Sequence, residues 1–292
     1  MNRLAGIELG GTKVIAVLGE GTAIVERVQR PLGSPEATLG WLRETLAGWG
    51  ATAPIAALGI ASFGPIGLDT GRADYGRLLR TPKPGWSGFD LIGPLGFAGP
   101  TLLHTDVTAA ALAEGRFGAA RGCDDFAFMT VGTGIGVGIV VDGEPLPGRL
   151  HPEAGHIRIA RIDGDEFGGT CPFHGDCLEG LASGSAIAAR AGRPGEALAD
   201  DDPAWCFVID ALAQGCATLL LTLSSERIVL GGGVINARPW RVERIATRTA
   251  ELLAGYLPYV TDRAPLAPAA LGQDAGPTGA LILAEMALAP AR

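Results

Sequence analysis

Lysine is almost absent from this chain of 292 residues. Lys13 and Lys83 stand against 21 arginines, and both lie in segments rich in glycine or proline rather than in amphipathic helices. Biased base composition could leave two lysines by chance. Alternatively, a compact ammonium is needed at these places, because the planar guanidinium of arginine has a different shape and hydrogen-bonding geometry. For Lys83 these two explanations are about equally favoured.

Runs of basic residues are absent as well, and the net charge is −8. Nucleic acids and anionic membrane surfaces both require concentrated positive charge, so neither is an expected partner. We find no stretch that approaches the roughly 20 apolar residues of a membrane span, and the start MNRLAGIELGG lacks the pattern of a signal peptide. We therefore expect a cytoplasmic protein with a small ligand that is neutral or bears phosphate.

Glycine is the residue in excess, with 45 copies, while 47% of the residues are hydrophobic and 18% are charged. This composition is typical of a globular protein with many tight turns, and the length favours two domains. The expected strands cover residues 4–9, 14–18, 24–29, 56–61, 101–105, 126–131, 136–141 and 227–230, the last of which closes the second unit. The expected helices cover residues 35–49, 107–117, 180–191, 203–223, 239–257 and 276–289.

Strands mixed with helices on this plan predict an α/β protein. The element order starts again near Phe126, although no sequence repeat of about 20 to 50 residues accompanies it. Residues 149–177 have no clear period and indicate an irregular insertion, which is usually functional or stabilised by a metal.

Three glycine-rich turns follow expected strands, at Gly10–Lys13, Gly132–Gly136 and Gly231–Val234. Glycines allow backbone N–H groups to converge on an anion, and a threonine hydroxyl adds a donor for a phosphate oxygen. The chain has neither the GxxxxGK[ST] loop nor a GxGxxG turn that opens a helix. Any one of these loops could be only a turn, but three in this order indicate phosphate binding.

The segment Cys171-Pro-Phe-His174-Gly-Asp-Cys177 spaces three metal-ligand side chains as CxxHxxC. Tetrahedral zinc requires one further ligand, for which His156 and His151 both compete. Two alternatives are a chance grouping of polar residues and a Cys171–Cys177 disulfide, which a reducing compartment disfavours. The other cysteines have no evident role.

Six motifs taken together resemble the ROK family of sugar kinases and repressors, within the actin, hsp70 and hexokinase fold group. They are GGTK, TDVTAAALAE, VGTGIGVG, HPEAGH, CPFHGDC followed by LEG, and LGGGV, and the resemblance runs from about Gly6 to Ala284. It implies two duplicated ribonuclease H-like lobes with a cleft between them. We expect a small lobe over 1–107, completed by a helix over 276–292, and a larger lobe over 108–275 with a zinc-stapled insertion at 149–180. It also suggests a homodimer.

The resemblance implies an ATP site that works with Mg²⁺. Gly10, Gly11 and Thr12, followed by Lys13, would hold the β- and γ-phosphates, Thr133 and Gly134 the other side of the phosphates, and Gly231, Gly232 and Gly233 the adenosine. Glu8 stands where the fold group usually has an aspartate near Mg²⁺, so we do not assign it as a direct ligand.

Asp106 is the expected catalytic base, which takes the proton of the sugar hydroxyl. Its place between a strand and a helix would by itself suggest a helix N-cap, and the assignment as base rests on the resemblance. The asparagine that usually precedes this aspartate is Thr105 here. The expected sugar-binding residues are Ser62, Gly64, Pro65, Lys83, Thr105, Asp106, Glu153, His156 and Glu179.

Two further segments, Ser62–Gly67 and Thr81–Trp86, look like the fructokinase branch of the family. The expected reaction is therefore ATP-dependent phosphorylation of fructose to fructose 6-phosphate, with mannose, glucose, an N-acetylhexosamine or sedoheptulose as alternatives. A sugar-sensing repressor is the second class, but repressors of this family carry a helix-turn-helix before the first glycine loop, and only five residues precede Gly6.

The family pattern favours His156 as the fourth zinc ligand. A closed Cys2His2 set leaves no position for substrate, so the metal would be structural. It would hold Glu153 and Glu179 in place.

Overall fold

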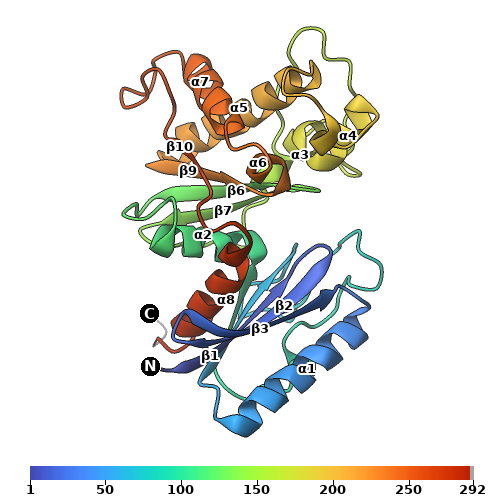
Figure 1. Ribbon diagram of the computed structural model, residues 1–292, viewed down its shortest axis with the longest axis vertical. Helices are drawn as coiled ribbons and strands as arrows, with labels where there is room; N and C mark the ends of the chain where they lie inside the picture. The colour runs from blue at the N-terminus through green and yellow to red at the C-terminus, as the bar shows by residue number, and fades with distance from the viewer. Residues whose placement is uncertain (290–292) are drawn as a thin grey trace. The chain divides into compact units, whose positions relative to one another are not determined.

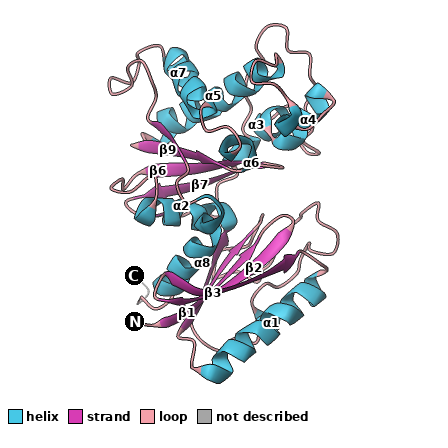
Figure 2. Ribbon diagram, in the orientation of Figure 1, coloured by secondary structure: helices cyan, strands magenta, loops and turns pink. Residues whose placement is uncertain are grey.

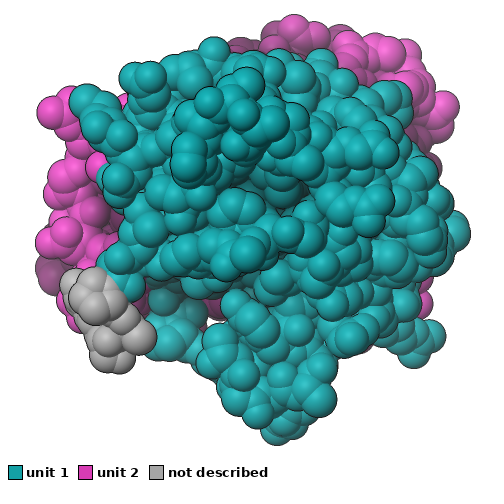
Figure 3. All heavy atoms as spheres, turned by 90° about the horizontal axis from the view of Figure 1, so that it is seen from below, with its two compact units in different colours: residues 1–113, 145–151, 273–292 teal, residues 114–144, 152–272 magenta. Residues whose placement is uncertain are grey.

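The computed structural model describes residues 1–289, which divide into two compact units (Figures 1 and 3). Unit 1 comprises Met1–Ala113, Pro145–His151 and the chain from Gln273 onward, and unit 2 comprises Glu114–Glu144 and Pro152–Gly272. The lobes expected over 1–107 and 108–275 stay predictions. The helix expected over 276–292 reaches into residues 290–292, which lie outside the described residues.

Unit 1 is built on a five-stranded sheet with the order β3-β2-β1-β4-β5. The strands are β1 (Arg3–Leu9), β2 (Lys13–Glu20), β3 (Ala23–Pro31), β4 (Ala57–Ser62) and β5 (Thr101–Thr105). The first three form an antiparallel meander, whereas β4 pairs in parallel with both β1 and β5. This confirms the expected strands of the first half to within a few residues.

Helices cover both faces of this sheet, as Figure 2 shows for α1 (Pro35–Thr52) and α8 (Ala275–Met286). Neighbouring residues of a strand point to opposite faces. Val14 of β2 accordingly joins the core that includes Leu42 of α1, and Ile15 joins the core that includes Leu281 of α8. Because both faces are buried there, β1, β2 and β4 are almost continuously apolar, whereas the edge strand β3 is largely exposed and carries charged residues.

Unit 2 has a second five-stranded sheet with the order β10-β9-β6-β7-β8. Its strands are β6 (Phe126–Val131), β7 (Ile135–Val141), β8 (Glu144–Pro145), β9 (Arg227–Gly231) and β10 (Leu266–Pro268). Its helices are α3 (Leu178–Ala182), α4 (Gly184–Ala191), α5 (Ala204–Leu223), α6 (Gly233–Asn236) and α7 (Arg241–Leu253), and α2 (Asp106–Phe117) spans the boundary between the units along the chain. In both sheets the strands, numbered along the chain within each unit, lie in the order third, second, first, fourth, fifth. The predicted repetition of element order is therefore confirmed.

Two expectations for unit 2 were wrong. The helix expected over 180–191 is two helices, because Ser183 ends α3 and then caps α4, its Oγ accepting a hydrogen bond of 3.2 Å from Ala186 N. The strand at Arg227 does not close the unit, since β10 adds to the sheet beside β9. With three residues, β10 is too short to show an apolar period.

Helix α5 corrects the expectation that no segment is long and apolar enough to span a membrane. By length and composition alone its 20 residues pass that test, with Asp210 as the one charged residue among them. Of the apolar window, 61% is buried inside the structure, and a core helix passes the same test. The short polar interruptions in its sequence hid the length of this apolar run.

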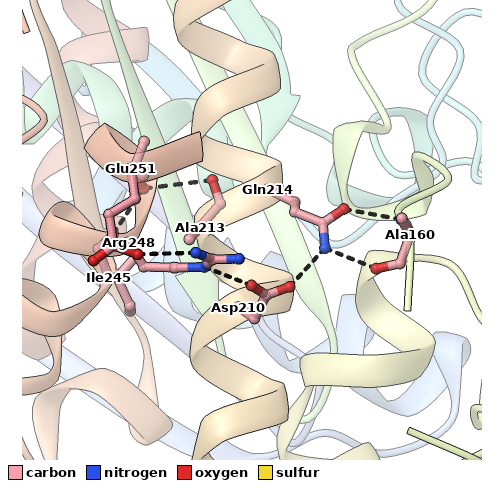
Figure 4. A network of polar contacts seen from close by, with 8 residues as sticks. Ala160, Asp210, Ala213, Gln214, Ile245, Arg248 and Glu251 are labelled. Carbon is pink, nitrogen blue, oxygen red and sulfur yellow. Dashed lines mark hydrogen bonds and ion pairs between the residues drawn. The ribbon is translucent and has the colours of Figure 1, made fainter. Parts of the chain in front are cut away.

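The charge inside α5 is paired (Figure 4). Asp210 accepts hydrogen bonds of 2.7 Å from Arg248 Nε on α7 and from Gln214 Nε2 on its own helix. Gln214 also bonds both the N–H and the carbonyl of Ala160, which ties the irregular insertion to α5. A buried carboxylate requires such partners to offset its loss of hydration.

Candidate active site

Asp106 is the first residue of α2, directly after β5. The capping interaction of this helix is made by Thr105, whose Oγ1 accepts from Thr108 N at 3.2 Å and lies 2.8 Å from Thr108 Oγ1. The Asp106 carboxylate accepts one hydrogen bond of 2.8 Å from Val107 N. The residue that caps α2 is therefore Thr105 and not Asp106. The hydroxyl of Thr105, which was predicted to bind sugar, is engaged in this cap.

The surroundings of Asp106 favour its neutral form. Burial raises the pKa of Asp106 to about 6, while the hydrogen bond from Val107 and the positive charge of Lys83 lower it. A carboxylate with this pKa is ionised near neutral pH and still basic enough to accept a proton from a hydroxyl in a transition state.

A second carboxylate, Glu8 on β1, lies near Asp106. Burial and, to a lesser extent, the charge of Asp106 raise the pKa of Glu8 to about 7, while Lys13 and Arg27 oppose the shift. Glu8 Oε2 is buried and has no hydrogen-bond partner among residues 1–289. Two acidic groups in one desolvated region make it costly for both to be charged.

The first glycine loop joins β1 to β2 as a tight hairpin in which Gly10 N donates to Lys13 O at 3.0 Å. Lys83 reaches this hairpin from a distant loop: its Nζ donates to Gly11 O and lies 5.1 Å from the centre of the Phe63 ring. Unit 1 thus holds these predicted residues: Gly10, Gly11, Thr12, Lys13, Lys83 and Asp106.

The predicted sugar loop follows β4. Ser62 is fully buried and its hydroxyl donates to Phe63 O at 3.0 Å, so it is engaged by its own chain. The Gly64–Pro65 peptide is cis. His151, the competing zinc ligand, belongs to unit 1, where its Nε2 accepts a hydrogen bond of 3.1 Å from Ile66 N. The sequence did not predict this contact.

The second glycine loop joins β6 to β7 and is held by side chains from two helices. Glu179 Oε2 on α3 accepts from Ile135 N at 2.9 Å, and Ser185 Oγ on α4 donates to Thr133 O at 2.9 Å. A Cβ at Gly134 would lie only 2.5 Å from Glu179 Oε2. A side chain at position 134 would therefore displace the Glu179 carboxylate, and Glu179, predicted to bind sugar, orders the backbone of a predicted phosphate loop.

The third loop, Gly231–Gly233, carries the chain from β9 into α6. Gly232 has φ 86°, and a Cβ there would come within 2.5 to 2.6 Å of Val131 and Thr130 atoms. A side chain at this position would be strained and would also clash. The close approach of β9 to β6 thus explains this glycine.

A cavity of about 700 Å³ in unit 2 adjoins the second and third loops. Its lining residues are Gly132, Thr133, Gly184, Ser185, Ala188, Pro194, Gly195, Glu196, Trp205, Gly233, Val234, Ala237, Arg238 and Arg241. Its volume is in the range of cofactor sites.

Most of these lining residues were not predicted from the sequence. Arg241, for example, is only 3% exposed, with its guanidinium carbon 3.4 Å from the centre of the Trp205 ring and its Nη1 donating to Val234 O at 2.8 Å. Residues of α5 and α7 form this wall through contacts far apart in sequence, and no local pattern marks them.

A cluster of possible metal ligands lies in the insertion, and its members are His156, Cys171, His174 and Cys177. Their ligand atoms all lie within 4.8 Å of one another. Cys171 Sγ is 3.6 Å from Nδ1 of His156 and of His174, and Cys177 Sγ is 3.5 Å from His156 Nδ1. Ligands at tetrahedral zinc, with bonds of about 2.3 Å to sulfur and 2.05 Å to nitrogen, are separated by about 3.6 Å.

The donor types and their spacing therefore fit zinc. Cys171 and Cys177 are free thiols in the structure rather than a disulfide. Glu153 is exposed and precedes a short 3-10 helix (Ala154–His156), so it stands close in sequence to one ligand. Glu179 follows Cys177 by two residues.

Comparison with known proteins identifies the family. The ROK family model matches residues 4–287. A fructokinase from Pediococcus pentosaceus is 39% identical over 290 residues, covering 98% of each chain. The ROK hexokinase of Thermus thermophilus has a TM-score of 0.80 at 29% identity, covering 97% of this chain and 98% of that one.

A ROK family glucokinase from Streptomyces griseus, solved in complex with glucose and AMPPNP, has a TM-score of 0.77 at 26% identity, covering 98% of this chain and all of that one. The resemblance inferred from the motifs and the hexokinase-like, two-domain α/β fold are thus confirmed. This chain belongs to the ROK family.

Proposed function

We propose that this protein is an ATP-dependent sugar kinase that converts fructose to fructose 6-phosphate. The observation that carries the proposal is the desolvated carboxylate of Asp106 in the unit that holds the first glycine hairpin. The choice of fructose is supported by the 39% identity to a fructokinase, against 26% to a glucokinase.

In this reaction the sugar hydroxyl oxygen forms a bond to the γ-phosphorus of ATP, the bond from that phosphorus to the bridging oxygen breaks, and ADP leaves. Asp106 accepts the hydroxyl proton. Backbone N–H groups of the glycine loops bind phosphate oxygens, and the cavity of unit 2 takes the nucleoside. Mg²⁺ enters with ATP as part of the substrate and offsets the phosphate charge.

The test is a coupled ADP-release assay with Mg-ATP against fructose, mannose, glucose, N-acetylmannosamine, N-acetylglucosamine and sedoheptulose. We expect the highest kcat/KM with fructose. Preference for another sugar would overturn the choice of fructose but not the assignment of the protein as a kinase. If the protein binds a sugar but phosphorylates none, the assignment as a kinase is overturned and a sugar sensor is favoured.

The proposal includes a structural zinc ion held by His156, Cys171, His174 and Cys177, which fits the measured ligand spacing. We expect elemental analysis to find one zinc per chain, and Cys177→Ser to lose it and lower the Tm, since structural zinc contributes to folding. Cys206→Ser, at an exposed cysteine, is the matched control. The zinc proposal would be contradicted if the purified protein contained no zinc and its Tm did not change when a chelator was added.

The proposal extends to a cytoplasmic homodimer. Light scattering after size-exclusion chromatography would report a mass of twice 29.8 kDa. A mass of one chain at micromolar concentration would contradict it.

A further inference from the structure

Lys83, one of two lysines in the chain, lies in a place where a cation is costly. Its side chain is half-buried, and burial lowers the pKa of Lys83, while the nearby charge of Asp106 raises it. Its ammonium stands over Phe63, whose ring packs edge-on against Trp86 at 5.4 Å between centres. An aromatic face attracts a cation and also restricts its position.

The ammonium is fixed from a second side by the first glycine hairpin, because Lys83 Nζ donates to Gly11 O. Gly11 lies 72 residues away in sequence, so this contact joins two distant loops of unit 1. A carbonyl oxygen repels phosphate oxygens, and a cation bound to it offsets that repulsion. An ammonium has three donors, of which Gly11 takes one.

Lys83 also supplies the positive charge that acts on Asp106. The charge of Lys83 lowers the pKa of Asp106, whereas the charge of Asp106 raises the pKa of Glu8. Lys13 and Arg27 face Glu8 instead. Among the described residues, Lys83 is thus the cation whose charge acts on the predicted base.

From these contacts we infer that Lys83 is a positioning residue for phosphoryl transfer, whose ammonium fixes the first glycine hairpin and supplies the positive charge facing Asp106. This inference rests on the proposed function. It replaces the role as a sugar ligand that the sequence suggested for Lys83.

The test compares wild type with Lys83→Met, which removes the charge and keeps the length, and with Lys83→Arg, which keeps the charge. The pH dependence of kcat/KM for the preferred sugar is measured from pH 5 to 9. We expect the acidic limb of the pH profile of Lys83→Met to move to higher pH by about one unit. The reason is that the pKa of Asp106, beside Glu8, rises when the positive charge of Lys83 is removed. Lys83→Arg is expected to keep the limb of wild type and to lose activity through the changed contact with Gly11.

Arg43→Met removes an exposed cation from α1 and is the control for the loss of charge alone. Thermal melting checks that each variant is folded. If Lys83→Met raises the KM for the sugar and leaves the acidic limb unmoved, Lys83 is a sugar ligand and the inference is overturned, while the kinase stands.

A second readout does not depend on turnover. The carboxyl carbon of ¹³C-labelled aspartate titrates in an NMR spectrum, and the Asp106→Asn variant assigns its signal. The inference requires the pKa of Asp106 to be higher in Lys83→Met than in wild type, and an unchanged titration would overturn it. If wild type phosphorylates no sugar, the proposed function fails, and this titration still decides whether Lys83 acts on Asp106.

Discussion

The sheets of the two units share one strand order, and in each the hairpin between the first two strands carries a glycine loop. Around the loop of unit 1 stand ionisable side chains with shifted pKa values, Glu8, Lys83 and Asp106. The loop of unit 2 is instead fixed by neutral backbone contacts and by Glu179, and it borders a cavity. In the function that we propose, one backbone frame is thus used twice, for proton chemistry in unit 1 and for nucleotide binding in unit 2.

The largest expected effect comes from removing the chemistry of unit 1 alone. Asp106→Asn should lower kcat by roughly 100- to 10,000-fold, which is the usual contribution of a general base. ATP affinity, measured by calorimetry, should stay within a factor of about three, since unit 2 is untouched. Glu44→Gln, at an exposed acid of α1, is the matched control. A retained turnover in Asp106→Asn would remove the contrast between the units.

The insertion is present in unit 2 and has no counterpart in unit 1. Asp165 and Arg190 form a buried ion pair with distances of 2.5 and 2.9 Å, their side chains 5% and 8% exposed. Arg190 also lies over the rings of Phe167 and Phe207. Asp165→Asn should lower the free energy of unfolding by about 3 to 5 kcal/mol, because it leaves a buried cation unpaired.

Urea denaturation measures this loss, and Asp163→Asn, two residues away and exposed, serves as the control. Equal stability of the two variants would show that the insertion is held by other contacts.

Gly134→Ala alters the loop of unit 2 alone. Its Cβ would meet Glu179 Oε2 at 2.5 Å and displace the hydrogen bond to Ile135. We expect kcat/KM for ATP to fall by roughly 10- to 100-fold, since displacements of about 1 Å have effects of this size. The KM for the sugar should change less. Gly48→Ala, at an open position of α1, controls for the added methyl group.

The smallest expected effect concerns the stability that unit 1 loses by burying its carboxylates. The folded pKa of Asp106, about 6, exceeds the value of 3.8 of an unperturbed aspartate. The folded state therefore binds a proton more tightly, and its stability falls as the pH rises from about 4 to about 6. At pH 8, Asp106→Asn should be more stable than wild type by about 1 to 3 kcal/mol.

The gain in stability of Asp106→Asn should vanish at a pH of about 3 or below, where both states of wild type are largely protonated at this site. Denaturation curves at the two pH values check the sign. A variant less stable than wild type at pH 8 would mean that the charged carboxylate stabilises unit 1.

The local features of this molecule could be predicted from sequence. The central strands of unit 1, β1, β2 and β4, are buried on both faces and so form apolar runs. The three glycine loops and the spacing from Cys171 to Cys177 are likewise contained in a few consecutive residues. Asp106 was assigned through the family motif, because its position alone also suited a helix cap, and only the structure assigns that cap to Thr105.

Features that depend on distant contacts could not be predicted. Trp205 and Arg241 read as ordinary residues of two helices, and they line the cavity only because α5 and α7 pack together. The contact of Glu179 with Ile135 joins residues 44 positions apart. Strand β10 has three residues and is held by pairing with β9 rather than by any pattern of its own.

The short distance between Cys177 and Glu179 limits how the insertion can change in evolution. Glu179 bonds the second glycine loop from the first turn of α3, and Cys177 is the residue that caps this helix. A change in the loop before Cys177 that shifts the start of α3 would also shift the carboxylate that bonds the hairpin. The sequence between Ile157 and Asp176 is thus free to drift only where that start stays in place.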